Sequence, residues 1–237
     1  MHRTLLVVGA HSADFVWRAA GAIAITTATG GRAQVVALSY GERGESGELW
    51  KQPNQTVERV KEIRHNEAKA AADVLGADLE AFDLGDYPLV ADTQAVERLT
   101  DLIRRLEPNV ILTHAARDPF NPDHGVAYET TVKARQMASG AGVASAFKKI
   151  RPPELLLFEP HQPELCGFVP TTFLDISAVW EKKQEAMACM RAQAYLRQYY
   201  SERAGHRANH ARRICGRDDI RFAEAYQREV PIVVDAL

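Results

Sequence analysis

Short continuous apolar runs alternate along the chain with longer stretches whose apolar residues recur once per helical turn. A continuous apolar run is typical of a strand buried on both faces of a parallel sheet, and the helical spacing indicates an amphipathic helix. The pattern predicts strands near residues 4–10, 34–40, 79–84, 109–114, 153–159 and 172–176, with helices near 16–29, 56–75, 93–106, 125–138 and 178–200. This alternation predicts an α/β fold, with a Rossmann-like, mostly parallel sheet flanked by helices.

Side chains that can bind a metal follow two of the predicted strands. His11 and Asp14 come directly after the first apolar run, and Asp123 and His124 stand in a turn-rich segment after the fourth. Ligands in open α/β sheets bind beyond the carboxyl ends of strands, and a catalytic zinc takes three protein ligands from imidazole and carboxylate groups. We therefore predict that His11, Asp14 and His124 hold a zinc ion, and that Asp123 acts in catalysis or orients a ligand histidine. The alternative for the first pair is a helix N-cap, Ser12 or Asp14, beside a surface histidine.

The order of these motifs, a strand with Ala-His-x-x-Asp and later Pro-Asp-His, resembles the PIG-L/LmbE family of zinc-dependent N-acetylglucosaminyl deacetylases. Further segments fit the same pattern along most of the chain: Gly41-Glu42-Arg43-Gly44, Arg64 with Glu67, Asp175-Ile176-Ser177 with Lys182 or Lys183 and Ala186, and Ala223-Glu224-Ala225-Tyr226. The resemblance implies a PIG-L/LmbE-type α/β fold, and it places the family's metal ligands on His11, Asp14 and His124.

The first motif departs from the family at the position that matters most for hydrolysis. The family usually has Ala-His-Pro-Asp-Asp-Glu there, and its first aspartate is the general base that activates the zinc-bound water. This chain has Ser12, Ala13 and Phe15 at the proline, first aspartate and glutamate positions. Alanine cannot accept a proton, and loss of a general base typically costs ~10²–10⁴-fold in rate. The metal ligands are therefore kept while the base for deacetylation is missing.

The His-Ser-Ala-Asp start is similar to that of a non-hydrolytic class on this fold, the hydratases of gallate breakdown. This resemblance implies that the partner is a small-molecule unsaturated tricarboxylate, and that water is added to its activated double bond to give a 4-hydroxy-2-oxo acid. Two alternatives remain open from the sequence. The chain could be a metal-dependent N-acetyl-sugar deacetylase or amidase with a relocated base, or a catalytically silent metal-binding paralogue.

A replacement acid/base must come from another segment. The glycine-rich stretch 41–48 follows a predicted strand and offers three carboxylates, of which Glu48 is our first candidate because apolar neighbours raise the pKa of a carboxyl group. His161 follows the predicted strand at 153–159 and is a second candidate for proton transfer near neutral pH. The alternative is that both residues lie in solvated loops.

Arginine matches a carboxylate with two parallel hydrogen bonds, so a tricarboxylate substrate favours arginine partners. Arg43 and Arg117 flank the two predicted site segments, and Arg18 follows the first motif. We predict that these three bind substrate. The basic stretch 203–213 could clamp substrate, form a subunit contact or be a solvated face.

Composition narrows the function classes. The 237-residue chain has a formal net charge of −2, which argues against nucleic-acid binding, and no apolar run is long enough for a membrane span. Its three cysteines have no Cys-x-x-Cys spacing, which favours a reducing, cytoplasmic location. We expect a homo-oligomeric enzyme with one domain, 1–237, in which 200–237 is a C-terminal extension near the site or a subunit interface.

Overall fold

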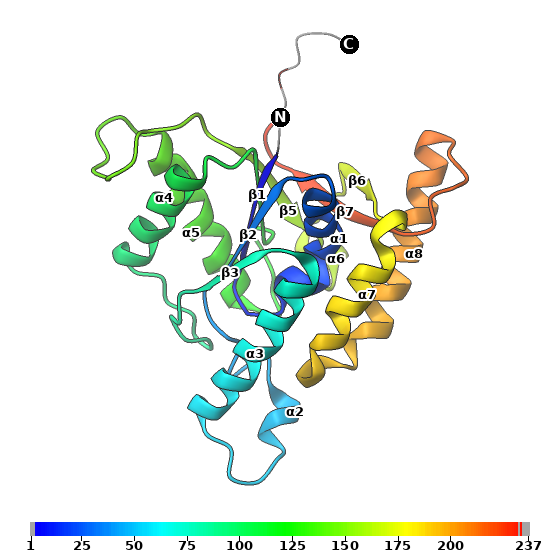
Figure 1. Cartoon of the computed structure of the whole chain (residues 1–237), viewed down its shortest axis with the longest axis horizontal. Coiled ribbons are helices and arrows are strands. Elements are labelled where there is room, and N and C mark those ends of the chain that lie inside the picture. Colours follow the sequence, from blue (N-terminus) through cyan, green and yellow to red (C-terminus); the bar gives the residue numbers. More distant parts are fainter. Residues whose placement is uncertain (1–2, 232, 234–237) are drawn as a thin grey trace.

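A central seven-stranded sheet organises the part of the chain that the computed structural model describes, residues 3–231 and 233. The strand order across the sheet is β3-β2-β1-β4-β5-β7-β6 (Figure 1). Strands β1 to β5 pair in parallel, whereas β7 runs antiparallel to both β5 and β6. The strands are β1 (Thr4–Gly9), β2 (Arg32–Ala37), β3 (Asp78–Ala81), β4 (Val110–Thr113), β5 (Glu154–Phe158), β6 (Thr172–Asp175) and β7 (Ala223–Arg228).

Helices cover both faces of this sheet. They are α1 (Asp14–Ala28), α2 (Gly47–Trp50), α3 (Val57–Leu75), α4 (Thr93–Leu106), α5 (Pro122–Ser139), α6 (Pro163–Cys166), α7 (Trp180–Cys189) and α8 (Leu196–Cys215), with short 3₁₀ turns at Ser177–Val179 and Arg191–Gln193. Helices α4 and α5 lie on one side, and α1, α3, α7 and α8 lie on the other (Figure 1).

Side chains of β1 alternate between two hydrophobic cores, as the pleat of a strand requires. Leu5 and Val7 pack into the core that also contains residues of α1, α3, α7 and α8. Leu6 and Val8 pack into the core built with α4 and α5. Because helices cover both faces, the central strands are apolar on both sides, which is why they appear as continuous runs in the sequence.

The α/β fold with a mostly parallel sheet was predicted correctly, but its C-terminal part differs from the prediction. The predicted helix 178–200 is two helices, because α7 ends at Cys189 and α8 begins only at Leu196. Strand β7 was not predicted, because its sequence, AEAYQR, contains no continuous apolar run. Helix α8 contains the whole basic stretch 203–213. Residues 232 and 234–237 of the predicted C-terminal extension lie outside the described residues.

The order in which strands are added to the sheet reverses at β1: β2 and β3 lie on one side of β1, and β4 and β5 lie on the other. Strand β1 has β2 on one side and β4 on the other, so the segments that follow β1 and β4 diverge at their carboxyl ends. Such a switch point leaves a crevice in which α/β proteins bind ligands. Among the described residues, no helix is both long and apolar enough to cross a membrane.

Candidate metal centre

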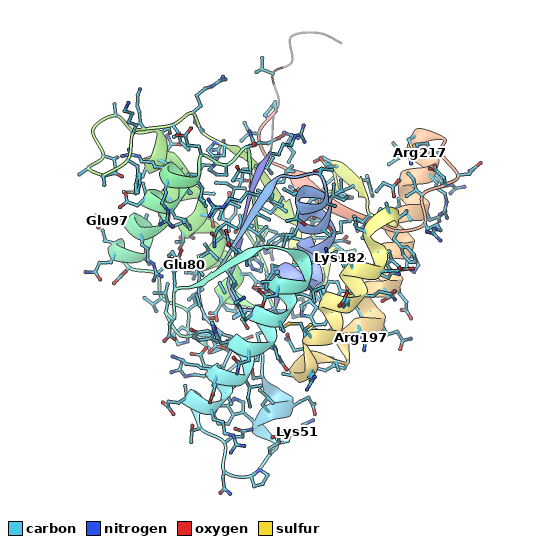
Figure 2. The ribbon with its side chains drawn as sticks, in the orientation of Figure 1. Lys51, Glu80, Glu97, Lys182, Arg197 and Arg217 are labelled. Atoms are coloured by element: carbon cyan, nitrogen blue, oxygen red, sulfur yellow. The ribbon has the colours of Figure 1, made fainter. Side chains whose placement is uncertain are left out.

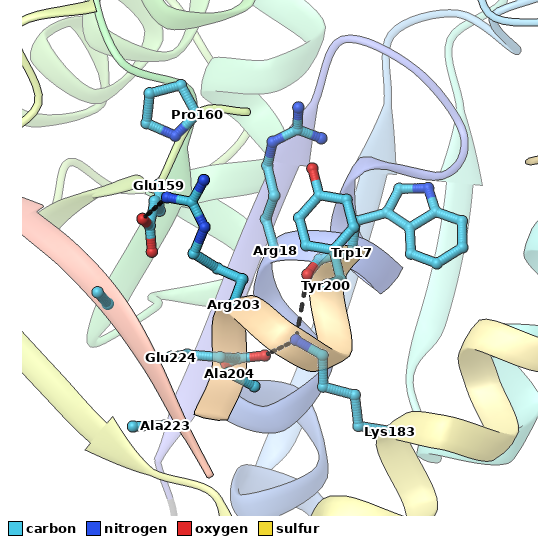
Figure 3. A pocket seen from close by; sticks show the side chains of 11 residues that line it. Trp17, Arg18, Glu159, Pro160, Lys183, Tyr200, Arg203, Ala204, Ala223 and Glu224 are labelled. Atoms are coloured by element: carbon cyan, nitrogen blue, oxygen red, sulfur yellow. Dashed lines mark hydrogen bonds and ion pairs between the residues drawn. The ribbon is translucent and has the colours of Figure 1, made fainter. Parts of the chain in front are cut away.

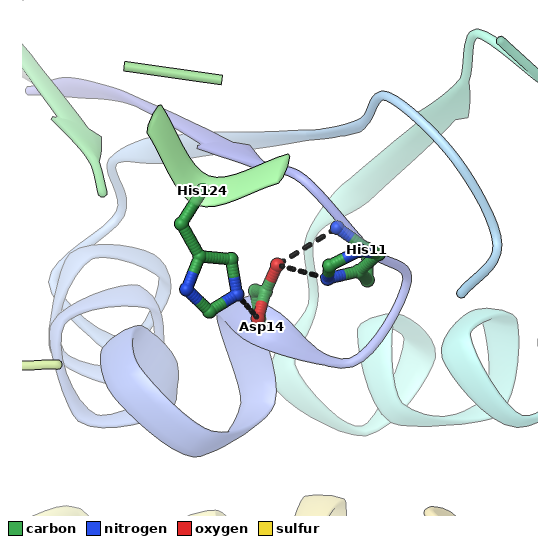
Figure 4. Close-up of side chains that lie close together, drawn as sticks. All are labelled: His11, Asp14 and His124. Atoms are coloured by element: carbon green, nitrogen blue, oxygen red, sulfur yellow. Dashed lines mark hydrogen bonds and ion pairs between the residues drawn. The ribbon is translucent and has the colours of Figure 1, made fainter. Parts of the chain in front are cut away.

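Three buried side chains from the two segments at this switch point surround a common space (Figure 4). Nδ1 of His11 lies 3.6 Å from Oδ2 of Asp14, and Nε2 of His124 lies 3.9 Å from Oδ1 of the same carboxylate. One ligand atom from each of the three residues lies within 4.8 Å of the other two. The structure therefore brings together the three residues predicted from the sequence as metal ligands.

Local structure fixes where these side chains point. The backbone amide of His11 donates to Oδ2 of Asp14 at 2.7 Å, which holds the carboxylate against the turn after β1. Asn121 caps the N-terminus of α5 by accepting from the amide of Asp123, and Pro122 occupies the first helical turn. A proline is favoured at this position because its missing N–H would be unpaired there. His124 consequently points inward from a rigid helix start.

Each of the two histidines has a carboxylate behind its ring. Nε2 of His11 donates to Oδ2 of Asp123 at 3.2 Å, and Nδ1 of His124 donates to Oδ2 of Asp118 at 2.8 Å. A carboxylate only accepts, so in its neutral form each ring carries its proton on that nitrogen and has a lone pair on the other. Those other nitrogens, Nδ1 of His11 and Nε2 of His124, are the ones that face Asp14. This arrangement is the one by which metal-binding histidines are oriented in proteins.

Burial and neighbouring charges control the ionisation of the cluster. Burial, reinforced by the charge of His114, lowers the pKa of His124 to about 3, so its imidazole is neutral at neutral pH. Burial alone would raise the pKa of Asp14, but His114, Arg18 and His124 hold it well below its usual range. Burial acts to lower the pKa of His11 and is outweighed by nearby carboxylates, first among them Asp123, so this pKa is raised.

The donor set fits a divalent metal ion. Nδ1 of His11 and Nε2 of His124 are buried and have no hydrogen-bond partner in the described part of the chain. Unpaired buried polar atoms are rare because their desolvation is costly, and two such nitrogens beside one carboxylate fit the ligand set of a cation. Two imidazole nitrogens and a carboxylate oxygen are a donor set suited to zinc.

A second group, His11 with Asp86 and Asp123, is less suited to a metal although its atoms are equally close. It has only one histidine, whose Nε2 is already hydrogen-bonded to Asp123, whereas the first group offers two nitrogens without a partner among the described residues. Asp86 also accepts from the amides of Arg43 and Gly44, and Asp123 from those of Tyr87 and Leu89. These carboxylates hold the surrounding loops in place. The position of Asp123 matches the predicted orienting role better than direct catalysis.

A hollow of about 270 Å³ opens onto the candidate metal centre, and we call it the site hollow. Arg18, His124 and His161, three of the predicted site residues, line it. The guanidinium of Arg18 donates to Oδ1 of Asp14 at 2.7 Å, and its Nε is buried with no hydrogen-bond partner among the described residues. The full lining is Trp17, Arg18, Glu45, Tyr87, Asp118, Phe120, Asn121, His124, His161, Gln162, Tyr195, Leu196 and Tyr200.

Three predicted site residues, Glu48, Arg43 and Arg117, belong neither to the candidate metal centre nor to the lining of this hollow. Helix α2 turns Leu49 inward and Glu48 outward, so that the Glu48 side chain is 54% exposed and pairs with Lys51 at the periphery of the molecule (Figure 2). The half-exposed Arg43 side chain donates to the carbonyl of Asp86 and lies outside the hollow. Arg117 is exposed. These positions differ from the ones we expected, because the neighbours of a residue in the sequence did not determine the direction of its side chain in these loops.

Glu45 is the carboxylate of the 41–48 stretch that reaches the cluster. Its Oε1 lies 3.9 Å from Nδ1 of His11, and its side chain is 25% exposed. Gly41 makes this possible: its φ is +71°, and a Cβ there would lie 2.9 Å from Cβ of Glu45 and 3.2 Å from Cβ of His11. His114, which was not among the predicted site residues, follows β4 directly and stacks on His124 with ring centroids 4.0 Å apart.

Helix α1, which carries Asp14 and Arg18, is anchored from behind by buried side chains of α7 and β7 (Figure 3). Lys183 donates to the carbonyl of Trp17 at 3.1 Å and to Oε1 of Glu224 at 2.6 Å. The carboxylate of Glu224 in turn accepts from the amides of Gly21 and Ala22. The segments 182–186 and 223–226, which the sequence pattern singled out, therefore hold the helix that presents the metal-facing carboxylate.

Known proteins share this architecture. The sequence model of the PIG-L family, which is described as GlcNAc-PI de-N-acetylase, matches residues 6–135 of this chain. The chain is 45% identical to the 4-oxalmesaconate hydratase of Pseudomonas putida, over 99% of this chain and 92% of that protein.

Solved structures of known proteins are also similar to this chain. The crystal structure of GalB, the 4-carboxy-2-hydroxymuconate hydratase from Pseudomonas putida, superposes with a TM-score of 0.96 at 45% identity and 99% coverage of both chains. The N,N'-diacetylchitobiose deacetylase of Pyrococcus horikoshii shares the fold, with a TM-score of 0.78 at 16% identity over 95% of this chain and 83% of that one. The chain therefore belongs to the PIG-L family.

Proposed function

We propose that this chain is a metal-dependent hydratase of aromatic-acid catabolism, which adds water to the double bond of 4-oxalomesaconate (4-carboxy-2-hydroxymuconate). The product would be 4-carboxy-4-hydroxy-2-oxoadipate. The observation that carries the proposal is Ala13, which is 2% exposed between His11 and Asp14. Its methyl group stands where the resemblance places the general base of the deacetylases, while the metal-facing side chains are kept. The similarity to the Pseudomonas putida hydratases supports the same conclusion.

The ion that we propose is zinc, held by Nδ1 of His11, the carboxylate of Asp14 and Nε2 of His124. When bound, such an ion polarises substrate oxygens and lowers the pKa of a bound water towards ~7. Asp118 and Asp123 keep both imidazoles in the tautomer that presents a lone pair to this position.

Glu45 is our candidate for the base that accepts a proton from the attacking water. Among the carboxylates of the 41–48 stretch, it is the one that lines the site hollow and lies against His11. Its two oxygens accept hydrogen bonds from neutral amide side chains, so the carboxylate is held in place without being paired to a cation. A fixed but uncompensated carboxylate is suited to proton transfer.

His161 is our candidate for the acid that protonates the neighbouring carbon. Its ring is half-buried in the hollow wall and stacks on Tyr199, with ring centroids 4.0 Å apart. Burial, Arg18 and Arg203 lower the pKa of His161, so its protonated form is a stronger acid than a free imidazolium. The wall position allows a substrate to lie between Glu45 and His161.

Arg18 is the guanidinium that we propose for one substrate carboxylate. The side chain lines the site hollow, and its NH1 contact with Asp14 fixes it in the hollow wall. Burial acts to lower the pKa of Arg18 and is outweighed by Tyr200, Asp14 and Glu45, so the group stays charged.

The test is a comparison of two substrates on zinc-loaded protein. We expect the absorbance of the conjugated enol of 4-oxalomesaconate to disappear, and no acetate to be released from N-acetylglucosamine derivatives. Acetate release with an unchanged enol would overturn the proposal and identify a deacetylase with a relocated base. A protein that binds zinc and leaves both substrates unchanged would be the silent paralogue.

A further inference from the structure

The carboxylate of Glu45 is held at both oxygens by amide side chains from distant parts of the chain. Nδ2 of Asn121 donates to Oε1 at 2.7 Å, and Nε2 of Gln193 donates to Oε2 at 2.8 Å. Asn121 precedes α5, whereas Gln193 ends the 3₁₀ turn between α7 and α8. Two bonds from opposite segments restrict the carboxylate more strongly than either bond alone.

The orientation of the Gln193 amide is fixed by other partners. Its Oε1 accepts from NH2 of Arg64 at 2.9 Å and from Nε1 of Trp17 at 3.3 Å. Both partners only donate, so the amide must turn its NH₂ group towards Glu45. Gln193 is 1% exposed and is not part of the lining of the site hollow.

Arg64 completes this arrangement without adding net charge. Its side chain is fully buried, and NH1 donates to Oε2 of Glu67 at 2.9 Å. Oε1 of Glu67 accepts from the amide of Ala192 at 2.8 Å, which ties α3 to the turn that carries Gln193. A buried ion pair is stable when its remaining donors and acceptors are satisfied, as they are here.

We propose that Gln193 is a positioning residue for the hydration reaction: it fixes the carboxylate of Glu45 and so raises the rate of proton transfer without touching substrate. This inference rests on the proposed function. The amide fixes the position of this carboxylate oxygen through a directional hydrogen bond, and it does so from outside the site hollow, where substrate cannot reach it.

Gln193→Glu separates this role from a purely structural one. The glutamate keeps an oxygen that accepts from Arg64 and Trp17, and it replaces the NH₂ donor by a second oxygen facing Glu45. We expect kcat to fall about 10–100-fold, as is typical when a supporting hydrogen bond to a catalytic group is removed, with KM changed less than about 2-fold. Gln193→Met, of similar volume and lacking the donor, should lower kcat in the same range. Gln198→Glu on the exposed face of α8 is the matched control and should leave both parameters unchanged.

A double-mutant cycle with Glu45→Gln gives the decisive readout. If Gln193 acts through Glu45, Gln193→Glu should cause no further loss of kcat in the Glu45→Gln background. An equal loss in both backgrounds, or an unchanged kcat in Gln193→Glu alone, would overturn the inference.

A crystal structure of zinc-loaded Gln193→Glu supplies a readout that does not depend on activity. We expect the carboxylate of Glu45 to be displaced while His11, Asp14 and His124 stay in place and zinc content is unchanged. If the wild-type protein fails to hydrate the enol, the proposed function falls. The crystal structure then still decides whether Gln193 holds Glu45, since an undisplaced carboxylate would refute it.

Discussion

The carboxylate of Asp118 accepts a hydrogen bond of 2.8 Å from Nδ1 of His124, on the side of the ring opposite the metal-facing nitrogen. Asp123 has the same relationship to His11 at 3.2 Å. The two carboxylates come from one turn-rich segment, yet each serves a histidine from a different strand end. Removing either should therefore affect metal binding while the three ligands remain.

Asp118→Ala tests this relationship. Without the carboxylate, the His124 ring can rotate or change tautomer, so we expect zinc affinity to fall about 10–100-fold. Competition with a zinc-binding dye measures the change. Asp73→Ala, at an exposed residue of α3, is the control and should bind zinc like the wild type. An unchanged affinity in Asp118→Ala would show that packing alone orients His124.

Glu45→Gln and Glu48→Gln form a matched pair from one loop. Glu45 lies against His11, whereas Glu48 pairs with Lys51 and is largely exposed. We expect kcat for enol hydration to fall about 10²–10⁴-fold in Glu45→Gln, because the proton acceptor is lost, and to stay within about 2-fold of wild type in Glu48→Gln. Steady-state kinetics on zinc-loaded variants measures both changes. A larger loss of kcat in Glu48→Gln than in Glu45→Gln would instead support Glu48, the residue predicted from the sequence, as the acid/base.

Gly21→Ala tests the close packing behind α1. A Cβ at Gly21 would lie 2.4 Å from Cγ2 of Ile176 and 2.9 Å from the Glu224 carboxylate. We expect the free energy of unfolding to decrease by about 1–3 kcal/mol, measured by urea denaturation. Gly205→Ala is the helical control: nothing lies within 4 Å of its Cβ position, so it should stabilise the protein by about 0.5–1 kcal/mol. Equal effects at both positions would contradict this packing.

Lys183→Met tests the ion pair that anchors the same helix. Both Lys183 and Glu224 are almost fully buried, and loss of the lysine leaves a buried carboxylate without its cation. We expect a decrease in unfolding free energy of about 3–5 kcal/mol. Lys69→Met removes an exposed pair with Asp73 and should change stability by less than about 1 kcal/mol. A mild effect at Lys183 would mean that the amides of Gly21 and Ala22 and the hydroxyl of Tyr226 are sufficient to hold the Glu224 carboxylate.

The site residues that could be predicted from the sequence are those whose position follows from the strand or helix next to them. His11, Asp14 and His124 were predicted because each directly follows a strand or begins a helix, where side-chain placement follows from the element. Glu45 was not preferred over Glu48, because the direction of this loop depends on the left-handed Gly41 and on bonds to Asp86, more than 40 residues away.

Gln193 could not have been found from the sequence. It reaches Glu45 across 148 residues of chain, and nothing in the local pattern around it indicates a buried amide. Strand β7 was missed for a related reason: its alternating alanines and polar residues become a strand only through pairing with β5 and β6. The homo-oligomeric state stays a prediction, which light scattering coupled to gel filtration can test.

The most direct test of the account is the rate of enol hydration as zinc is added to metal-free protein. We predict that the absorbance of the 4-oxalomesaconate enol is stable with the metal-free protein, that the rate rises linearly up to one zinc per chain, and that it then reaches a plateau. His124→Ala should remain inactive at the same zinc concentrations. A hydration rate that is the same with chelator and with zinc, or that survives in His124→Ala, would contradict a metal-dependent hydratase built on His11, Asp14 and His124.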